Sequence, residues 1–390
     1  MKAVVFHGEG DIRLDDVAEP KIKDDLDAIV QLTASAICGT DLHFLRGSMP
    51  PLPEGKILGH EGVGVVREVG KGVRNLKAGD RVVIGSTIAC GYCSYCRDGY
   101  TSQCDNANPA GPDTAFYGGP KSAGPFDGLQ AEYARIPFAN FNALKLPDEV
   151  NDDDAILLSD ILPTAYFAAD MAGIKPGRTV AVLGCGPVGQ MAIACAKMMD
   201  AGRIIAVDAE PARMEIARNQ GAEVVDFSKE DPAKVIKEMT GGIGVDRVID
   251  CVGVDADKKP REGKSRQWSA GDAPGMPLSG AIEMVAKAGT ISVVGLYPPG
   301  FNDIDLGKAF GKNLSIRMGD CPHRRYLPHL IRTVATGALR PSRILTQRTP
   351  FADAVAAYKA FERHEQGWLK VELLGAKPAP VATKGEVVTA

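Results

Sequence analysis

The chain has 390 residues, more than one hydrophobic core usually holds, so we expect two or three domains. Its apolar content of 45% and charged content of 24% are those of an ordinary globular protein, and a net charge of −4 gives no general reason to expect nucleic acid or anionic membrane as a partner. No apolar run is long enough to span a bilayer and residues 1–7 lack a signal-peptide core, so the expected location is the cytoplasm.

Short apolar runs separated by turn residues dominate the first part of the chain. Residues 3–6 and 28–32 fit β-strands at short spacing, and residues 56–85 continue the pattern with many glycines. Glycine-punctuated strands favour a small irregular β-barrel over a layered sheet. We expect functional side chains on the loops of this barrel, where a rigid scaffold can position them.

Two motifs in this region carry metal-binding residue types. They are Cys38-Gly-Thr40-Asp41-Leu-His43 and Gly59-His60-Glu61. A thiolate and an imidazole beside carboxylates suit zinc, so we interpret Cys38 and His60 as ligands of a catalytic zinc ion. Asp41 would accept a hydrogen bond from the second ring nitrogen of His60 and fix its tautomer. The alternative is that Cys38 and His60 are unrelated core residues.

Nine cysteines, an odd number, argue against a disulfide framework and favour metal ligands or buried thiols. Four of them occupy 15 residues in the pattern C-x2-C-x2-C-x7-C, namely Cys90, Cys93, Cys96 and Cys104. Short spacers let these thiolates turn onto one tetrahedral ion, and four sulfur ligands leave no open position, so we predict a structural zinc. A redox or iron–sulfur centre and unliganded buried thiols are the alternatives. Arg97 is the only basic residue of this lobe, which does not indicate nucleic-acid binding.

The middle of the chain changes from strands to helices. Residues 105–128 are rich in Gly, Pro, Asn and Asp and predict an exposed loop, whereas residues 129–136 return to strand-like alternation. A helix is predicted from Asp152, with acidic residues at its N-terminal end where the helix dipole favours them. Pro163 should interrupt or restart that helix.

A dinucleotide-binding pattern follows. A buried strand at 179–183 leads into Gly184-Cys-Gly186-Pro187-Val188-Gly189, then an apolar helix at 190–199 and a second strand that ends on Asp208. This glycine motif lies between a strand and a helix, with an acid 19 residues past its last glycine, which makes it a specific fingerprint. Its backbone and the helix N-terminus would bind the pyrophosphate.

The acid predicts which cofactor is used. Asp208 would accept hydrogen bonds from the adenosine ribose and repel a 2′-phosphate, so NAD is preferred over NADP. Arg213 is either a neighbour of the adenine end or a solvated helix charge.

Further strands predict a doubly wound parallel sheet with intervening helices; they lie at residues 223–226, 246–250, 289–296 and 314–318. Residues 255–268 break the rhythm and are interpreted as a solvated insertion loop. Residues 326–374 are mixed helix and strand, and a frayed tail is expected after Gly375.

Together these motifs resemble those of the zinc-dependent medium-chain alcohol dehydrogenases over roughly residues 1–375. The stretch Ser159-Asp160-Ile-Leu-Pro163-Thr164, the insertion and Met318–His323 are most similar to the glutathione-independent formaldehyde dehydrogenase branch. The resemblance implies an α/β fold with a GroES-like irregular β-barrel catalytic domain and a doubly wound Rossmann NAD-binding domain. The expected boundaries are 1–155 for the catalytic domain with its zinc lobe, 156–297 for the NAD-binding domain, 298–375 for a segment that completes the sheet and returns to the catalytic domain, and 376–390 for the tail.

The resemblance also implies roles for single residues. Asp160 stands where many members supply a second cysteine, so it would be the third ligand of the catalytic zinc; a helix-capping or solvated acid is the alternative. A zinc ion would act as Lewis acid on the substrate oxygen, and the alcohol proton would pass to Thr40, the cofactor ribose and His43. Thr164 would lie near the nicotinamide.

Two charged residues have open roles in this comparison. Glu61 would enter the metal coordination sphere transiently, or would be a purely structural carboxylate. Lys370 would contact the pyrophosphate, or would be a surface lysine.

The expected activity is NAD-linked oxidation of small alcohols or hydrated aldehydes, with two zinc ions per subunit in a homo-oligomer, either a dimer or a tetramer. A polyol or sugar dehydrogenase of the same fold is the alternative within enzymes, and a non-catalytic binding protein that retains the fold is the alternative outside them. In the formaldehyde dehydrogenase branch the inserted loop covers the adenine end and slows the release of NAD, which is a hypothesis for this chain.

Overall fold

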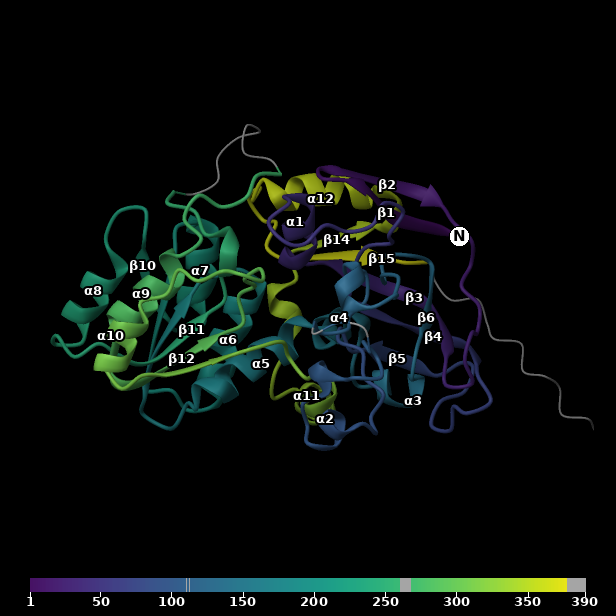
Figure 1. Cartoon of the computed structure of the whole chain (residues 1–390), viewed down its shortest axis with the longest axis horizontal. Coiled ribbons are helices and arrows are strands. Elements are labelled where there is room, and N and C mark those ends of the chain that lie inside the picture. Colours follow the sequence, from purple (N-terminus) through teal and green to yellow (C-terminus); the bar gives the residue numbers. More distant parts are fainter. Residues whose placement is uncertain (110, 112, 260–267, 377–390) are drawn as a thin grey trace, which may run out of the picture.

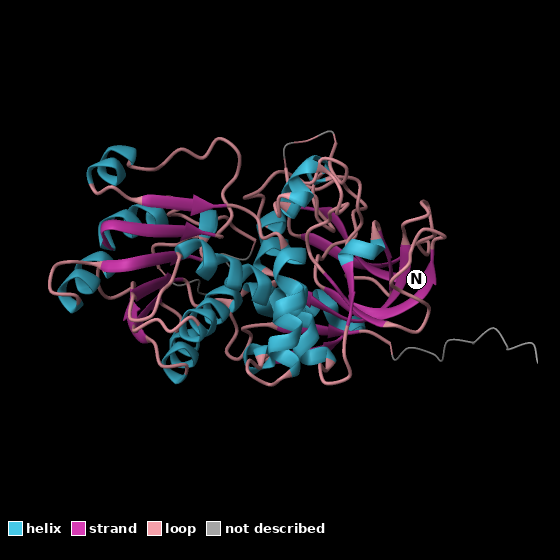
Figure 2. Ribbon diagram, turned by 90° about the horizontal axis from the view of Figure 1, so that it is seen from below, coloured by secondary structure: helices cyan, strands magenta, loops and turns pink. Residues whose placement is uncertain are grey.

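The computed structural model describes residues 1–109, 111, 113–259 and 268–376. The expected tail from residue 377 and the centre of the insertion, residues 260–267, lie outside the described residues. Two large sheets lie on opposite sides of the molecule, with a group of helices between them (Figures 1 and 2).

The first sheet is built mainly from the N-terminal part of the chain. It has seven strands, with order β14-β15-β3-β4-β5-β7 and β6 paired to β3. Register shifts within the β3–β4 pair mark bulges that bend these strands, as an irregular barrel requires. The strands are β3 (Ala28–Ile37), β4 (Gly62–Val69), β5 (Arg81–Ile84), β6 (Tyr133–Ile136), β7 (Ala143–Lys145), β14 (Gln347–Pro350) and β15 (Val371–Leu374), beside the separate hairpin of β1 (Lys2–Gly8) and β2 (Asp11–Asp16).

The second sheet has six parallel strands in the order β10-β9-β8-β11-β12-β13. Alternate side chains of β8 enter two different cores: Val180 and Val182 face one, and Ala181 and Leu183 face the other. Helices therefore cover both faces, and the predicted doubly wound sheet is confirmed. Its strands are β8 (Thr179–Leu183), β9 (Arg203–Asp208), β10 (Glu223–Asp226), β11 (Val245–Asp250), β12 (Val285–Val293) and β13 (Ser315–Met318).

One continuous core joins the two sheets through the central helices. It contains Ala34 and Ala36 of β3 as well as Val182 of β8. The helices nearest to it are α4 (Asp152–Ser159), α5 (Ile161–Ala172), α6 (Pro187–Met198) and α11 (His323–Ala335); the others are α1 (Gly39–Leu45), α2 (Ser94–Arg97), α3 (Ala139–Asn142), α7 (Pro211–Asn219), α8 (Pro232–Met239), α9 (Met276–Met284), α10 (Leu306–Gly311) and α12 (Ala354–Glu362).

The helix predicted from Asp152 breaks at Asp160. Helices α4 and α5 meet there at an angle of 50°, and Pro163 lies in the first turn of α5, where its missing N–H is no loss. The prediction that Pro163 marks a restart is confirmed, with the break three residues earlier. Within the described residues, no single helix is long and apolar enough to cross a membrane, and α4 with α5 passes that test only as a bent pair.

The prediction of an exposed loop at residues 105–128 is wrong. Ala107, Tyr117 and Phe126 are buried in the core of the first sheet together with the zinc-lobe cysteines. Phe116 of the same segment lies edge-on to the His60 ring, with ring centroids 6.2 Å apart. The segment therefore forms part of the wall beside the first metal motif.

The insertion also differs from the prediction. The Asp255 side chain is only 4% exposed, and Trp268 packs against the hydrophobic cluster of the N-terminal hairpin and α12. The described ends of the insertion are therefore docked on the catalytic part of the molecule, and a wholly solvated loop is wrong for these residues.

Strand β15 buries one carboxylate that gives a testable pH dependence. Neither oxygen of Glu372 has a hydrogen-bond partner among the described residues, and burial, followed by the nearby Asp153 charge, raises the pKa of Glu372 to about 7. Because this folded-state pKa lies above the value of 4.5 for an ordinary glutamate, the free energy of unfolding falls as the pH rises between these two values. We expect Glu372→Gln to stabilise the protein at pH 8 by about 2 kcal/mol and to have little effect near pH 5.

Thermal unfolding of wild type and Glu372→Gln across this pH range measures the difference. Glu68→Gln is a matched control, because Glu68 is an exposed carboxylate on β4 of the same sheet. A stability gap that does not change with pH would contradict the assignment.

Candidate active site and metal centres

Three separate parts of the chain bring the predicted catalytic ligands together. Cys38 follows β3, His60 precedes β4, and Asp160 lies at the break between α4 and α5. Their ligand atoms, with those of Glu61, all lie within 4.8 Å of one another, and all four residues are buried. The Asp160 Oδ2 atom is 3.3 Å from His60 Nε2 and 3.9 Å from Cys38 Sγ. Ligands of one tetrahedral zinc lie about 3.3–3.8 Å apart, given bond lengths of about 2.0–2.3 Å, so the cluster fits zinc.

Asp41 lies behind His60, as predicted. Its Oδ1 atom is 3.5 Å from His60 Nδ1, while Oδ2 accepts hydrogen bonds from the Cys38 backbone N–H at 3.0 Å and from Gln130 at 3.2 Å. Burial opposes charging the His60 ring, but Cys38 and the two aspartates outweigh it and raise the pKa of His60 well above its usual value. The Asp41 carboxylate thus supports both metal-binding segments.

His323 is a neighbour of the cluster to which the sequence assigned no role. Its Nε2 lies 2.8 Å from Asp160 Oδ1, and its Nδ1 lies 3.0 Å from Thr87 Oγ1. Burial alone would raise the pKa of Asp160, but hydrogen bonds from His323 and His60 hold it well below its ordinary value. Thr164 donates to the same Oδ1 atom at 2.9 Å. One oxygen of Asp160 therefore faces the ligand cluster and the other is held by α5 and α11.

Glu61 forms a fully buried ion pair with Lys370. The Lys370 ammonium lies 2.5 Å from Glu61 Oε1 and donates to the Ile37 carbonyl at 3.0 Å. Both side chains have no exposed surface, so the surface-lysine interpretation is wrong. Lys370 is also not among the described residues that line the nucleotide cavity. The second carboxylate oxygen, Oε2, has no hydrogen-bond partner among the described residues and is available to a metal ion.

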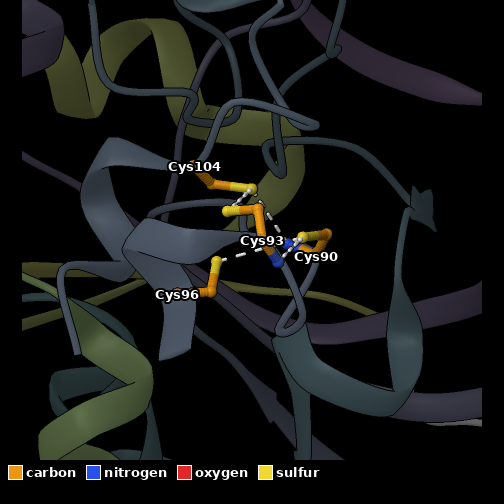
Figure 3. Close-up of side chains that lie close together, drawn as sticks. All are labelled: Cys90, Cys93, Cys96 and Cys104. Atoms are coloured by element: carbon orange, nitrogen blue, oxygen red, sulfur yellow. Dashed lines mark hydrogen bonds between the residues drawn. The ribbon is translucent and has the colours of Figure 1, made fainter. Parts of the chain in front are cut away.

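The four-cysteine lobe gathers its thiols around one point (Figure 3). The Sγ atoms lie within 4.8 Å of one another, with 4.0 Å between Cys90 and Cys96 and 3.9 Å between Cys93 and Cys104. Backbone N–H groups of Tyr92 and Cys93 point at the Cys90 sulfur. Burial opposes ionisation, but hydrogen bonds from the surrounding backbone and thiols lower the pKa of Cys93 to about 7. Burial raises the pKa of Cys96 and Cys104, so of these three thiols only Cys93 is shifted toward the thiolate without a metal ion. Four converging sulfurs suit a closed structural zinc site, in which the ion itself would stabilise the thiolates.

A cavity of about 880 Å³ extends from the ligand cluster to the parallel sheet. Cys38, Thr40 and His43 line it near the first sheet. The rest is lined by the carboxyl ends of the parallel strands and by neighbouring helices and loops, with Gly184, Gly186, Pro187, Val188, Asp208 and Arg213 among the lining residues. Thr164 is not among the described lining residues; its hydroxyl instead faces Asp160.

The glycine motif has the shape that a dinucleotide needs. A Cβ on Gly189 would lie 1.8 Å from the Gly184 carbonyl, whereas one on Gly186 would meet nothing within 4 Å. Gly189 therefore allows α6 to pack closely on the strand, and Gly186 leaves room for a ligand. Asp208 fixes the position of this loop, because its Oδ2 atom accepts a hydrogen bond from the Cys185 backbone N–H at 2.6 Å.

A metal-ligand cluster and a dinucleotide loop on one cavity define the class of metal-dependent, nicotinamide-linked dehydrogenases. Family models agree: residues 24–148 match the alcohol dehydrogenase GroES-like domain, and residues 187–259 match the zinc-binding dehydrogenase domain. The chain is 38% identical over 377 residues to an uncharacterized zinc-type alcohol dehydrogenase-like protein of Bacillus subtilis, covering 96% of this chain and 100% of that protein.

Two further comparisons extend this result. The glutathione-independent formaldehyde dehydrogenase of Pseudomonas aeruginosa is 34% identical over 385 residues, covering 93% of this chain and 94% of that one. The solved structure of alcohol dehydrogenase TADH from Thermus sp. ATN1 matches with a TM-score of 0.83 and 36% identity, covering 96% and 100% of the two chains. The chain belongs to the zinc-type alcohol dehydrogenase family. Its fold class and its NAD and zinc cofactors, as predicted, are those of this family.

Proposed function

We propose that this dehydrogenase oxidises small alcohols or hydrated aldehydes with NAD, and that Cys38, His60 and Asp160 hold its catalytic zinc. The strongest support for the proposal is that the ligand atoms of these three residues converge. Cys38 also lines the nucleotide cavity, so a metal ion held by the three residues would lie beside that cavity. The formaldehyde dehydrogenases among the relatives support the substrate class. Asp208, at the end of β9, supports NAD over NADP.

Bound zinc would supply Lewis acidity toward the substrate oxygen, and NAD would accept the hydride. The protein would supply the route for the proton. Thr40 and His43 are three residues apart on α1, so their side chains share one helix face, and both line the cavity. Thr40 would accept the hydroxyl proton of a substrate bound beside Cys38, and His43 would be the last protein group to carry that proton. Bound NAD would supply ribose hydroxyl groups as further proton carriers. Glu61 Oε2, which has no hydrogen-bond partner among the described residues, would be an additional ligand for the metal.

We also propose the organisation of the whole chain. A catalytic domain at 1–155, an NAD-binding domain at 156–297 and a returning segment at 298–375 agree with the membership of the two sheets. Cys90, Cys93, Cys96 and Cys104 would hold the second, structural zinc. A cytoplasmic homo-oligomer is part of this proposal; the open edge of the six-stranded sheet at β13, where Met318 is 61% exposed, supports self-association.

A substrate panel tests the proposal. Formaldehyde, ethanol, longer alcohols and polyols are assayed with NAD or NADP by the appearance of the reduced cofactor, and formaldehyde is also assayed for dismutation products without added cofactor. We expect turnover of formaldehyde or small alcohols with NAD. Turnover of polyols alone would favour a polyol or sugar dehydrogenase, and turnover unchanged by a zinc chelator would argue against the metal assignment. NAD released on denaturing the purified protein would support tight cofactor binding.

A further inference from the structure

His43, the expected last protein group on the proton route, is held by a carboxylate from the insertion. Asp255 ends the short helical turn Gly253–Asp255 after β11, and its Oδ2 lies 2.7 Å from His43 Nδ1. The two residues are 212 positions apart in the chain. Their side chains are 10% and 4% exposed, so the pair is shielded from water.

Asp255 is held firmly by other donors. Its Oδ2 also accepts from Arg46 Nη1 at 2.8 Å and from Ser48 Oγ at 3.0 Å, while Oδ1 accepts from the backbone N–H of Gly271 at 3.2 Å. Glu362 of α12 holds Arg46 through both carboxylate oxygens, and its Oε1 accepts from the Trp268 backbone N–H at 3.0 Å. Both ends of the insertion are thereby joined to the helix that carries His43.

The chemistry of this cluster decides which nitrogen of His43 carries the proton. Burial favours a neutral Asp255, but the hydrogen bond and the charge of His43, together with the charge of Arg46, hold the pKa of Asp255 well below its ordinary value. An ionised carboxylate only accepts hydrogen bonds, so Nδ1 of His43 must be the donor. Whenever the ring is neutral, it therefore keeps a free lone pair on Nε2. When Nε2 gains a proton, two positive charges, on His43 and Arg46, face two negative charges, on Asp255 and Glu362.

We propose that Asp255 is a positioning residue for proton transfer, which fixes His43 with Nδ1 protonated so that Nε2 is the accepting atom at the cavity. The inserted segment also lines the nucleotide cavity through Ala256 and Asp257. It therefore contributes Asp255, the residue that orients His43, from the side of the cavity formed by the nucleotide-binding part of the chain. The catalytic part of the role rests on the proposed function. The tautomer itself does not, and it is measured separately.

Nitrogen-15 NMR of histidine-labelled protein reads the tautomer directly. The chain has only six histidines, and the signals that disappear in His43→Gln assign His43. We expect wild-type His43 to be protonated on Nδ1 alone and the Asp255→Ala variant to show a mixture or the Nε2-protonated form. Asp272→Asn, which changes an exposed carboxylate of the same insertion, should leave the spectrum unchanged. A wild-type His43 protonated on Nε2 would overturn the proposal without any variant, and so would a tautomer unaffected by Asp255→Ala.

Kinetics test the consequence for turnover. We expect Asp255→Ala to lower kcat by about 10–100-fold, a part of the contribution of general acid–base catalysis, with the substrate KM little changed. In the His43→Gln background the same change should have no further effect, because Asp255 acts through His43. Asp255→Asn, whose carbonyl can still accept from Nδ1, should lose less. Additive losses in the double variant would show that Asp255 only anchors the insertion. If wild type turned over no substrate of the panel, the proposed function would fail while the NMR result still decided the tautomer.

Discussion

Replacing Cys38 by alanine should lower kcat/KM by about 10³-fold or more and release the zinc of the cavity site. The change removes the one thiolate of the cluster and leaves His60 and Asp160, which is one ligand fewer than catalytic zinc sites keep. Lewis-acid stabilisation of the developing charge amounts to several kcal/mol, and each 1.36 kcal/mol is a factor of ten in rate. Zinc content per subunit and steady-state kinetics measure both effects, with an expected fall from two zinc ions to one.

Cys195→Ala is the matched control, because Cys195 is an equally buried thiol on α6 in the central core. It should retain both zinc ions and most of the activity. A Cys38→Ala protein with two zinc ions and wild-type turnover would show that the cluster is not the catalytic site.

Replacing Cys96 by serine should cost more than about 4 kcal/mol of folding free energy, because a structural zinc stabilises only the folded lobe. Cys96 and Cys104 lie in the same core as the segment around Tyr117, so loss of the ion would also loosen that wall. Thermal unfolding, limited proteolysis and zinc content measure the effect. We expect a lower melting temperature, cleavage within residues 90–128, and one zinc ion retained at the other site.

Ser94→Ala is the control for this prediction, since Ser94 is exposed and lies between two of the lobe cysteines. It should change neither zinc content nor stability. Iron and visible absorbance in the wild-type protein would instead favour the iron–sulfur alternative. An unchanged melting temperature in Cys96→Ser would contradict a structural role for the ion.

Local sequence patterns predicted the parts of the site that are close in sequence. The glycine motif and the four cysteines have fixed short spacings, because one loop or one ion imposes them. Cys38, His60 and Asp160 were found because each lies in a short motif typical of the family. The break at Asp160 was predicted from Pro163 to within three residues.

The contacts that the sequence did not predict join residues far apart along the chain. His323, Lys370 and Asp255 contact Asp160, Glu61 and His43 across separations of 163, 309 and 212 residues. Neither periodicity nor propensity indicates which buried carboxylate a distant cation will meet. The pattern of Met318–His323 pointed to the right segment, but it gave no reason to choose His323.

The wrong prediction of an exposed loop at residues 105–128 has a different cause. Turn-forming residues dominate the composition of residues 105–128, and its few apolar residues, such as Ala107 and Phe126, follow no period of two or 3.6. Irregular segments bury side chains through tertiary packing alone, so composition predicted exposure where the structure has core.

The pairing of β15 with β3 determines when, during synthesis of the chain, strand β3 can become fully paired. Val371 lies opposite Ile37, next to Cys38, so the strand that leads to the first ligand receives its last neighbour only after residue 371 has been added. Translation at about 5–20 residues per second leaves that edge of β3 open for tens of seconds while more than 300 residues are added. A nascent protein stalled before residue 371 would display an unpaired apolar strand, which makes this edge a natural place for a chaperone to hold.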